Sequence, residues 1–172
     1  MSDFRAMNKP SENPNPESEI IRVLLIEDNP GDARLVREML AESGTNRFNL
    51  EHVERISQGL TRLSQENFQV ILLDLTLPDG HGLETVRRVC NVAPHIPVLV
   101  LTGLNDETIG IRAVQQGAQD YLVKGQMDGN LLMRAIRYAT ERKRAEETLR
   151  RSEEKAKRLA QENEIVAEIG RI

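Results

Sequence analysis

Three short runs in this chain are apolar at every position: residues 23–26, 70–73 and 98–101. A strand with one face in water alternates apolar and polar residues, whereas a strand covered on both faces does not need to alternate. Such runs are typical of a parallel sheet with helices on both sides. They constrain the fold more than any other feature of the sequence.

Two further runs, residues 48–53 and 121–123, also predict strands. Between the runs, apolar residues recur at helical spacing: Ala33, Val36, Met39 and Leu40; Leu83, Val86, Val89 and Cys90; and Ile109, Ile111, Ala113 and Val114. Five strands that alternate with helices predict an open α/β sandwich, a doubly wound five-stranded parallel sheet.

Composition narrows the class of protein. The 172 residues allow one domain with a real core and an additional segment, and the net charge of -4 with 3% aromatic residues argues against a nucleic-acid-binding protein. No apolar run is long enough to span a membrane. Residues 1–20 are polar, have no signal-peptide pattern and predict a disordered leader. The single cysteine, Cys90, excludes an internal disulfide and is interpreted as a small core residue. These features fit a cytoplasmic protein.

Polar side chains interrupt the pattern where the predicted strands end. Glu27 and Asp28 follow the first strand, Asp74 ends the third, Thr102 ends the fourth and Lys124 follows the fifth. In an open parallel sheet the carboxyl ends of the strands share one edge, and functional groups collect there. We therefore expect these five side chains to lie together.

Clustered carboxylates repel one another unless a cation is present, and oxygen ligands suit Mg²⁺. Asp74 is placed to act as a nucleophile, as carboxylates do when they form an aspartyl phosphate. Lys124 supplies a positive charge and Thr102 a hydroxyl donor for phosphoryl oxygens. The chemistry expected at this edge is therefore phosphoryl transfer to a carboxylate.

Four motifs in this order resemble the response-regulator receiver domain of two-component signalling: IEDN at 26–29, LLDLTLPDG at 72–80, VLTG at 100–103 and DYLVKG at 120–125. The resemblance covers residues 21–138 and implies a flavodoxin-like receiver fold. It implies that Asp74 accepts a phosphoryl group from the phosphohistidine of a histidine kinase or a phosphotransfer protein. Glu27, Asp28, Asp74 and the main-chain carbonyl of Thr76 match the Mg²⁺ ligands.

The resemblance also implies a switch. Thr102 matches the switch hydroxyl, Tyr121 the aromatic side chain that changes rotamer with it, and Lys124 the lysine that pairs with the phosphate. Gly125 departs from the family, which usually has proline there, often after a cis bond. We expect a trans peptide before Gly125, because a cis bond at a non-proline residue costs about 2.5–4 kcal/mol, and a looser loop after it.

Other polar residues receive no catalytic role. His52 and His95 are expected to have surface or packing roles, His81 to solvate the edge and Asp79 to cap or shape its turn. Residues 29–32, Asn-Pro-Gly-Asp, are interpreted as ordinary capping of the first helix.

Residues 139–172 predict that the last helix continues as a signalling helix toward a downstream domain absent from this chain. Asn163 takes a core position of its heptad pattern, which favours a two-stranded coil in register. The pattern consists of Ala145, Leu149, Ser152, Ala156, Leu159, Asn163 and Val166. Ile165, Ile169 and Ile172 begin an offset stripe. We expect a parallel homodimer through this helix; a charged, solvated extension is the alternative.

The end, ENEIVAEIGRI, resembles the segment that leads into GAF-type domains, and the parent protein is expected to be a sensor histidine kinase or a similar multidomain protein.

Two other functions compete with the phospho-accepting domain, which is not a conventional enzyme. A Mg²⁺-dependent phosphohydrolase of the haloacid-dehalogenase-like type needs a second acid two residues after the nucleophile, and Thr76 stands there. A scaffold that works without phosphorylation is disfavoured by the intact Asp28, Asp74, Thr102 and Lys124.

Overall fold

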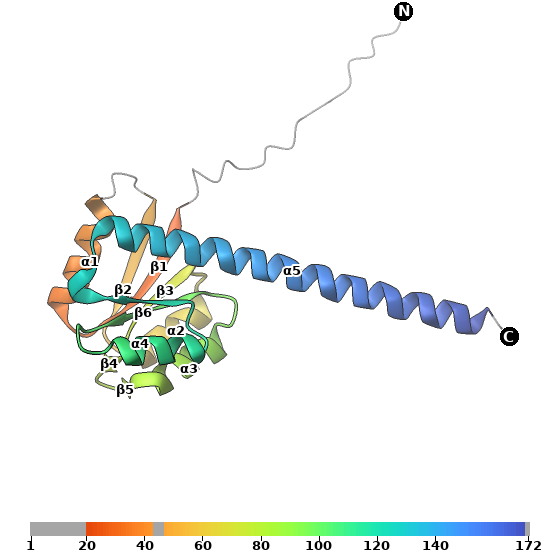
Figure 1. Cartoon of the computed structure of the whole chain (residues 1–172), viewed down its shortest axis with the longest axis horizontal. Coiled ribbons are helices and arrows are strands. Elements are labelled where there is room, and N and C mark those ends of the chain that lie inside the picture. Colours follow the sequence, from red (N-terminus) through yellow and green to blue (C-terminus); the bar gives the residue numbers. More distant parts are fainter. Residues whose placement is uncertain (1–19, 43–46, 171–172) are drawn as a thin grey trace, which may run out of the picture.

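The computed structural model describes residues 20–42 and 47–170. Five parallel strands form one sheet in the order β2-β1-β3-β6-β7 (Figure 1). Their bounds are β1 (Ile21–Ile26), β2 (Phe48–Val53), β3 (Val70–Asp74), β6 (Val98–Thr102) and β7 (Asp120–Val123). This confirms the predicted doubly wound parallel sheet. The predicted leader, except Ile20, lies outside the described residues, as does Ile172.

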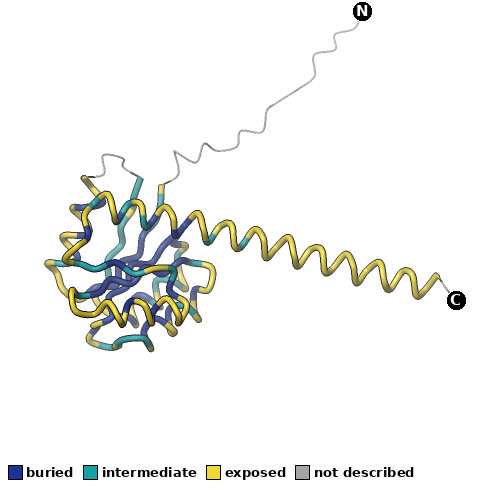
Figure 2. Tube along the Cα trace, in the orientation of Figure 1, coloured by how far each residue is buried: buried dark blue, intermediate teal, exposed yellow. Residues whose placement is uncertain are grey.

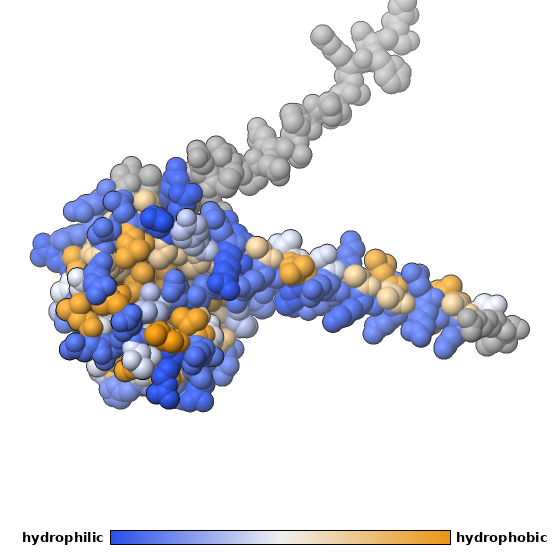
Figure 3. All heavy atoms as spheres, viewed as in Figure 1, coloured by the Kyte–Doolittle hydropathy of each residue, from blue (hydrophilic) through white to orange (hydrophobic). Residues whose placement is uncertain are grey.

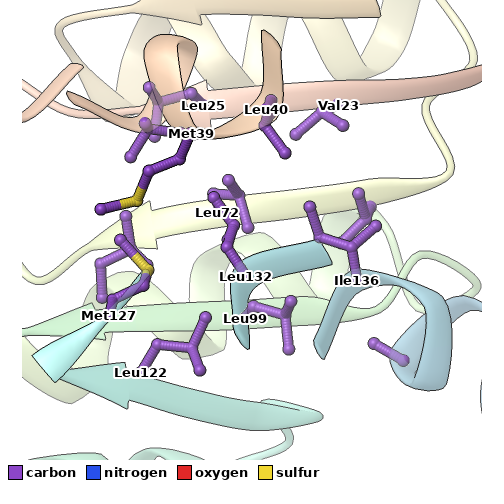
Figure 4. Packing of buried hydrophobic residues seen from close by; sticks show 14 of the residues in the cluster. Val23, Leu25, Met39, Leu40, Leu72, Leu99, Leu122, Met127, Leu132 and Ile136 are labelled. Atoms are coloured by element: carbon purple, nitrogen blue, oxygen red, sulfur yellow. The ribbon is translucent and has the colours of Figure 1, made fainter. Parts of the chain in front are cut away.

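Helices cover both faces of the sheet. On one side lie α1 (Pro30–Glu42) and α5 (Gly129–Ile169); on the other lie α2 (Ile56–Gln65), α3 (Gly82–Val92) and α4 (Glu107–Gln115). Successive residues of a strand point to opposite faces, so Leu25 packs toward α5 and Leu24 toward the other helices. Figure 4 shows Leu132 and Ile136 of α5 among Leu72, Leu99 and other strand residues.

Two small elements complete the loops at the carboxyl edge. The strands β4 (Thr76–Leu77) and β5 (Gly80–His81) pair antiparallel after β3, and a 3₁₀ turn, η1 (Lys124–Gln126), follows β7. Asp79 lies between β4 and β5, but it caps a different helix: its carboxylate accepts from the main-chain N–H groups of Ile56 and Ser57, at 2.9 and 3.0 Å. The expectation that Asp79 caps or shapes its own turn is thus corrected: its side chain caps the start of α2.

The apolar spacing located α4 but did not identify its buried face. Gly110 and Ala113 are buried, whereas Ile109, Ile111 and Val114 are exposed. The physical reason is close packing, because the ring of Tyr121 on β7 lies over Gly110 and brings the helix near the sheet. Only the smallest side chains fit beneath this helix.

The last helix continues without a break from Gly129 to Ile169, as the sequence indicates. Leu132, Ile136, Ala139 and Thr140 are buried on it, whereas the residues described beyond Thr140 are half-buried or exposed (Figure 2). The second part therefore projects from the domain (Figure 1). Within residues 20–42 and 47–170, no helix is both long and apolar enough to cross a bilayer.

Candidate phosphoryl-acceptor site

The five side chains that interrupt the sequence pattern lie at the carboxyl edge of the sheet, as predicted. Lys124, in η1, contacts two of the acids. Its Nζ lies 2.6 Å from Oε2 of Glu27, after β1, and 3.5 Å from Oδ1 of Asp74, at the end of β3. Parallel register explains this convergence, since β1, β3 and β6 are adjacent and end at the same edge.

A fourth acid, which the sequence interpretation left out, joins this group. Oδ2 of Asp32, in the first turn of α1, lies 2.8 Å from Nζ of Lys124. Asn29 caps the same turn as expected, with its Oδ1 accepting from Gly31 and Asp32 main-chain N–H groups at 2.8 and 3.2 Å. The cap places Asp32 above the edge of the sheet. The signal available in the sequence was its position four residues after Asp28.

Burial shapes the ionisation of this group. Glu27 is fully buried and Asp74 nearly so, and burial raises the pKa of both carboxyls, an effect that Lys124 opposes. Main-chain N–H groups of Leu75 and Thr76 also stabilise the Asp74 carboxylate; that of Leu75 donates to Oδ1 at 2.8 Å. Burial lowers the pKa of Lys124, but hydrogen bonds to Asp32 and Glu27 outweigh this and raise it. Lys124 is therefore held as a cation.

The acids outnumber the cation beside them. Glu27, Asp28 and Asp74 each present a carboxylate oxygen, and the three oxygens lie within 4.8 Å of one another. Lys124 supplies one positive charge against these three acids and Asp32. Three hard oxygen donors with excess negative charge, one of them on the exposed Asp28, fit a divalent ion such as Mg²⁺ that keeps part of its water.

Thr102 and Tyr121 lie on the adjacent strands of the same edge. The buried Thr102 hydroxyl donates to the main-chain carbonyl of Leu122 at 3.4 Å. The Tyr121 hydroxyl donates to Oε1 of Glu107, also at 3.4 Å, and its ring covers Gly110. A cavity of about 150 Å³ lies beside Asp74 and Thr102, with His81 and Asp106 also in its wall. The edge thus has room for a group next to the Asp74 carboxylate.

The remaining predicted residues have structural partners. Nε2 of His52 lies 2.7 Å from the main-chain oxygen of Glu27, and Nδ1 of His95 lies 2.8 Å from Oε1 of Glu147. Cys90 is half-buried against a core cluster. The described residues contain no cis peptide bond, so the bond before Gly125 is trans, as expected.

Comparison with known proteins gives one consistent result. The family model described as the response regulator receiver domain matches residues 23–137. The KDP operon transcriptional regulatory protein KdpE of Escherichia coli is 36% identical over 102 residues, which are 59% of this chain and 44% of that protein. The methanogenesis regulatory protein FilR1 of Methanothrix harundinacea is 32% identical over 106 residues, 59% of this chain and 23% of that protein. The chain thus spans less than half the length of these curated relatives.

Solved structures agree on the fold. A response regulator receiver domain protein from Clostridium thermocellum has a TM-score of 0.65 and 25% identity, over 73% of this chain and 98% of that one. A CheY-like receiver domain protein from Methanospirillum hungatei has a TM-score of 0.64 and 21% identity, over 74% and 99% of the two chains.

Proposed function

The chain belongs to the response regulator receiver family of two-component signalling, and from this premise we propose that Asp74 accepts a phosphoryl group from the phosphohistidine of a histidine kinase or a phosphotransfer protein. The contact between Lys124 and the Glu27, Asp32 and Asp74 carboxylates carries this proposal. It sets a nucleophile at a strand end beside a fixed cation, and the cavity next to Asp74 leaves access.

In the transfer step, one carboxylate oxygen of Asp74 attacks phosphorus as the bond between phosphorus and the histidine nitrogen breaks. The nitrogen keeps the bonding electron pair, and Asp74 becomes an acyl phosphate. Main-chain N–H donation to Oδ1 orients the carboxylate on the rigid strand end. Lys124, 3.5 Å from Oδ1, is positioned to pair with the phosphoryl oxygens as negative charge builds there.

Glu27, Asp28 and Asp74, with the Thr76 carbonyl, are the residues that would hold Mg²⁺. The ion would neutralise phosphoryl oxygens. The ion and the Lys124 ammonium group would then be two positive charges that share the neutralisation of the phosphoryl group. Asp32, which also contacts Lys124, holds the ammonium group in place.

The switch proposed for this domain starts at Thr102. Its hydroxyl donates to Leu122 at 3.4 Å, a long bond that is easily exchanged for a phosphoryl oxygen. Turning toward Asp74 frees space near β6, and Tyr121 moves inward from its place over Gly110. Both changes affect the face made by α4, β7 and α5. Phosphorylation therefore biases a two-state arrangement at the surface.

The output runs through α5. We assign residues 21–138 to the receiver and residues 139–172 to a signalling helix that leads to a downstream domain. The unbroken helix supports this assignment, since a shift of its first part is carried into the second. The exposed Leu149, Leu159 and Val166 support parallel pairing of two copies through their heptad spacing.

The test of the acceptor is treatment of the chain with acetyl phosphate, with and without Mg²⁺, followed by intact-mass spectrometry. One phosphate is expected in the presence of Mg²⁺ and none in Asp74→Asn. The matched control is Asp79→Asn, an acid on the next loop that caps α2 and should leave labelling intact. Equal labelling of Asp74→Asn would contradict the assignment.

A second experiment separates metal binding from phosphate pairing. Asp28→Asn removes a carboxylate from the metal site and is expected to weaken Mg²⁺ binding, measured by calorimetry. Lys124→Ala is expected to leave Mg²⁺ binding largely intact and to impair phosphoryl transfer. If only Lys124→Ala lost the metal, the two roles would be reversed.

A further inference from the structure

Asp32 is an acid of the site that has no part in the proposed metal binding. The three carboxylate oxygens that lie within 4.8 Å of one another belong to Glu27, Asp28 and Asp74, and Asp32 is outside this group. Its contact at the site is with the ammonium group of Lys124, at 2.8 Å. Any effect of Asp32 on phosphoryl chemistry through this contact therefore acts by way of Lys124.

The ammonium group of Lys124 is shared unequally among its neighbours. Its Nζ lies 2.6 Å from Oε2 of Glu27 and 2.8 Å from Oδ2 of Asp32, both distances typical of charge-assisted hydrogen bonds. It lies 3.5 Å from Oδ1 of Asp74, which is longer than an ordinary hydrogen bond. Lys124 thus pairs more closely with these two acids than with the expected phosphoryl acceptor.

The two close partners of Lys124 differ in what it costs them to lose it. Glu27 is fully buried and its other oxygen accepts from the main-chain N–H of Asn29 at 3.0 Å, so without Lys124 it would be a buried charge with no cation beside it. The side chain of Asp32 is 36% exposed, so water can replace the ammonium group at little cost. Asp32 is therefore the partner that Lys124 can leave.

The start of α1 holds Asp32 in position for this contact. The side chain of Asn29 accepts from the main-chain N–H groups of Gly31 and Asp32, and its main-chain oxygen accepts from that of Ala33 at 3.0 Å. Asp32 thereby stands in the first turn of the helix, where the unpaired N–H groups favour a negative side chain. Its carboxylate is anchored by its own helix and does not depend on Lys124 for its place.

We propose that Asp32 restrains Lys124 in the unphosphorylated domain and competes with the phosphoryl group for it, so that Asp32 sets how tightly the site holds a phosphoryl group. This inference rests on the proposed function and adds a positioning residue that acts through Lys124. When Asp74 carries the phosphoryl group, the ammonium group keeps Glu27 and exchanges Asp32 for a phosphoryl oxygen.

The first test measures the affinity for beryllofluoride, a phosphate mimic, by calorimetry at saturating Mg²⁺. Asp32→Asn removes the competing charge and is expected to bind the mimic about two- to fivefold more tightly, the range of a partly exposed ion pair. Glu38→Gln removes the same charge from α1 at a residue paired with Arg34 and should leave the affinity unchanged. An unchanged or weaker affinity in Asp32→Asn, or an equal gain in Glu38→Gln, would overturn the proposal.

The second test is a double-mutant cycle with Lys124. In a Lys124→Ala background, Asp32→Asn is expected to lose its gain in affinity, because no ammonium group is left to compete for. Asp32→Glu keeps the charge and should bind the mimic like the unmodified chain. Equal gains for Asp32→Asn with and without Lys124 would show that Asp32 repels the mimic directly, and the proposal would be overturned.

Uptake of phosphate from acetyl phosphate, measured by intact mass, separates this inference from the proposed function. No uptake by the unmodified chain would contradict the proposed function. Normal uptake, together with equal mimic affinities of Asp32→Asn and the unmodified chain, would contradict only the role of Asp32.

Discussion

The two halves of α5 form one helix but are stabilised differently. Residues 129–140 pack Leu132, Ile136 and Ala139 against the sheet, while residues 141–169 bury no side chain. The second half has no internal Gly or Pro and relies on helix-forming residues and on ion pairs such as Arg142–Glu146 and Arg150–Glu154. Each such pair contributes only a little, because both partners are exposed and water screens their charges.

This difference assigns separate tasks to the two halves. The packed half takes its position from the core, so a change in the receiver would move it. The projecting half is helical through its helix-forming residues and ion pairs, and the domain leaves its Leu149, Leu159 and Val166 exposed. Figure 3 shows apolar atoms recurring along one side of the projecting helix. A change in the first half should therefore affect global stability, and a change in the second half should affect association.

The largest expected effect comes from Ile136→Ala. Ile136 is fully buried, so its truncation should lower the free energy of unfolding by about 2–5 kcal/mol. Leu159 lies exposed on the second half, so Leu159→Ala should change the free energy of unfolding of the monomer by less than about 0.5 kcal/mol. Urea unfolding at low protein concentration measures both. Similar losses in the two variants would show that the helix is not divided as described.

The next effect concerns a helix position where alanine is unfavourable. In an exposed helix such as the second half of α5, alanine is more stable than glycine by about 0.5–1 kcal/mol. At Gly110 an added Cβ would lie 2.5 Å from Cδ2 of Tyr121, so Gly110→Ala is expected to destabilise the domain by about 1–3 kcal/mol. The control is the same substitution in a Tyr121→Ala background, where it should become stabilising. A loss of stability in both backgrounds would mean that the ring is not the cause.

A smaller effect is expected where the packed half begins. The Asp128 side chain accepts from the main-chain N–H of Leu131 at 2.7 Å and caps α5. Asp128→Ala should lower the free energy of unfolding by about 1 kcal/mol, whereas Asp128→Asn should retain most of the cap. Thermal unfolding of both variants is the measurement. An equal loss of stability in the two variants would show that the negative charge of Asp128, and not its hydrogen bond to Leu131, stabilises the helix start.

The smallest effect is a contrast in pH dependence between two carboxyls, one on the body and one on the projecting half. Hydrogen bonds to Ser57 and Ile56 lower the pKa of Asp79 to about 2, and hydrogen bonds to Arg150 and His95 lower that of Glu147 to about 2. The lowered pKa of Asp79 stabilises the fold above about pH 4, and this stabilisation is lost as the pH falls toward 2. For Asp79, which caps α2, we expect a loss of about 0.3–1 kcal/mol in Asp79→Asn at pH 7.

That deficit should close between about pH 4 and pH 2, as Asp79 in the unmodified chain becomes protonated. Glu147→Gln should leave global unfolding unchanged, because it lies on the projecting half, and should alter only the NMR signals of the His95 ring. Urea unfolding across this pH range compares the two variants. A global loss in Glu147→Gln would show that the His95 contact belongs to the folded core.

The local pattern of apolar and polar residues was enough to predict the strands and the position of most of the site residues. Residues 23–26, 70–73 and 98–101 are apolar because both faces of the sheet are covered, and that requirement is visible in the sequence itself. Parallel strands must end at one edge, so Glu27, Asp74 and Lys124 could be placed together without coordinates. The unbroken α5 follows in the same way from the lack of a stop signal before Gly170.

Tertiary packing decided which distant groups touch. The contact of Asp32 with Lys124 depends on how α1 sits on the sheet, and the capping of α2 by Asp79 depends on the path of a loop more than twenty residues away. The buried face of α4 depends on the Tyr121 ring above Gly110. Burial and main-chain direction repeat along a chain and leave a periodic signal, whereas a contact between two side chains depends on the relative placement of whole elements, which no local pattern encodes.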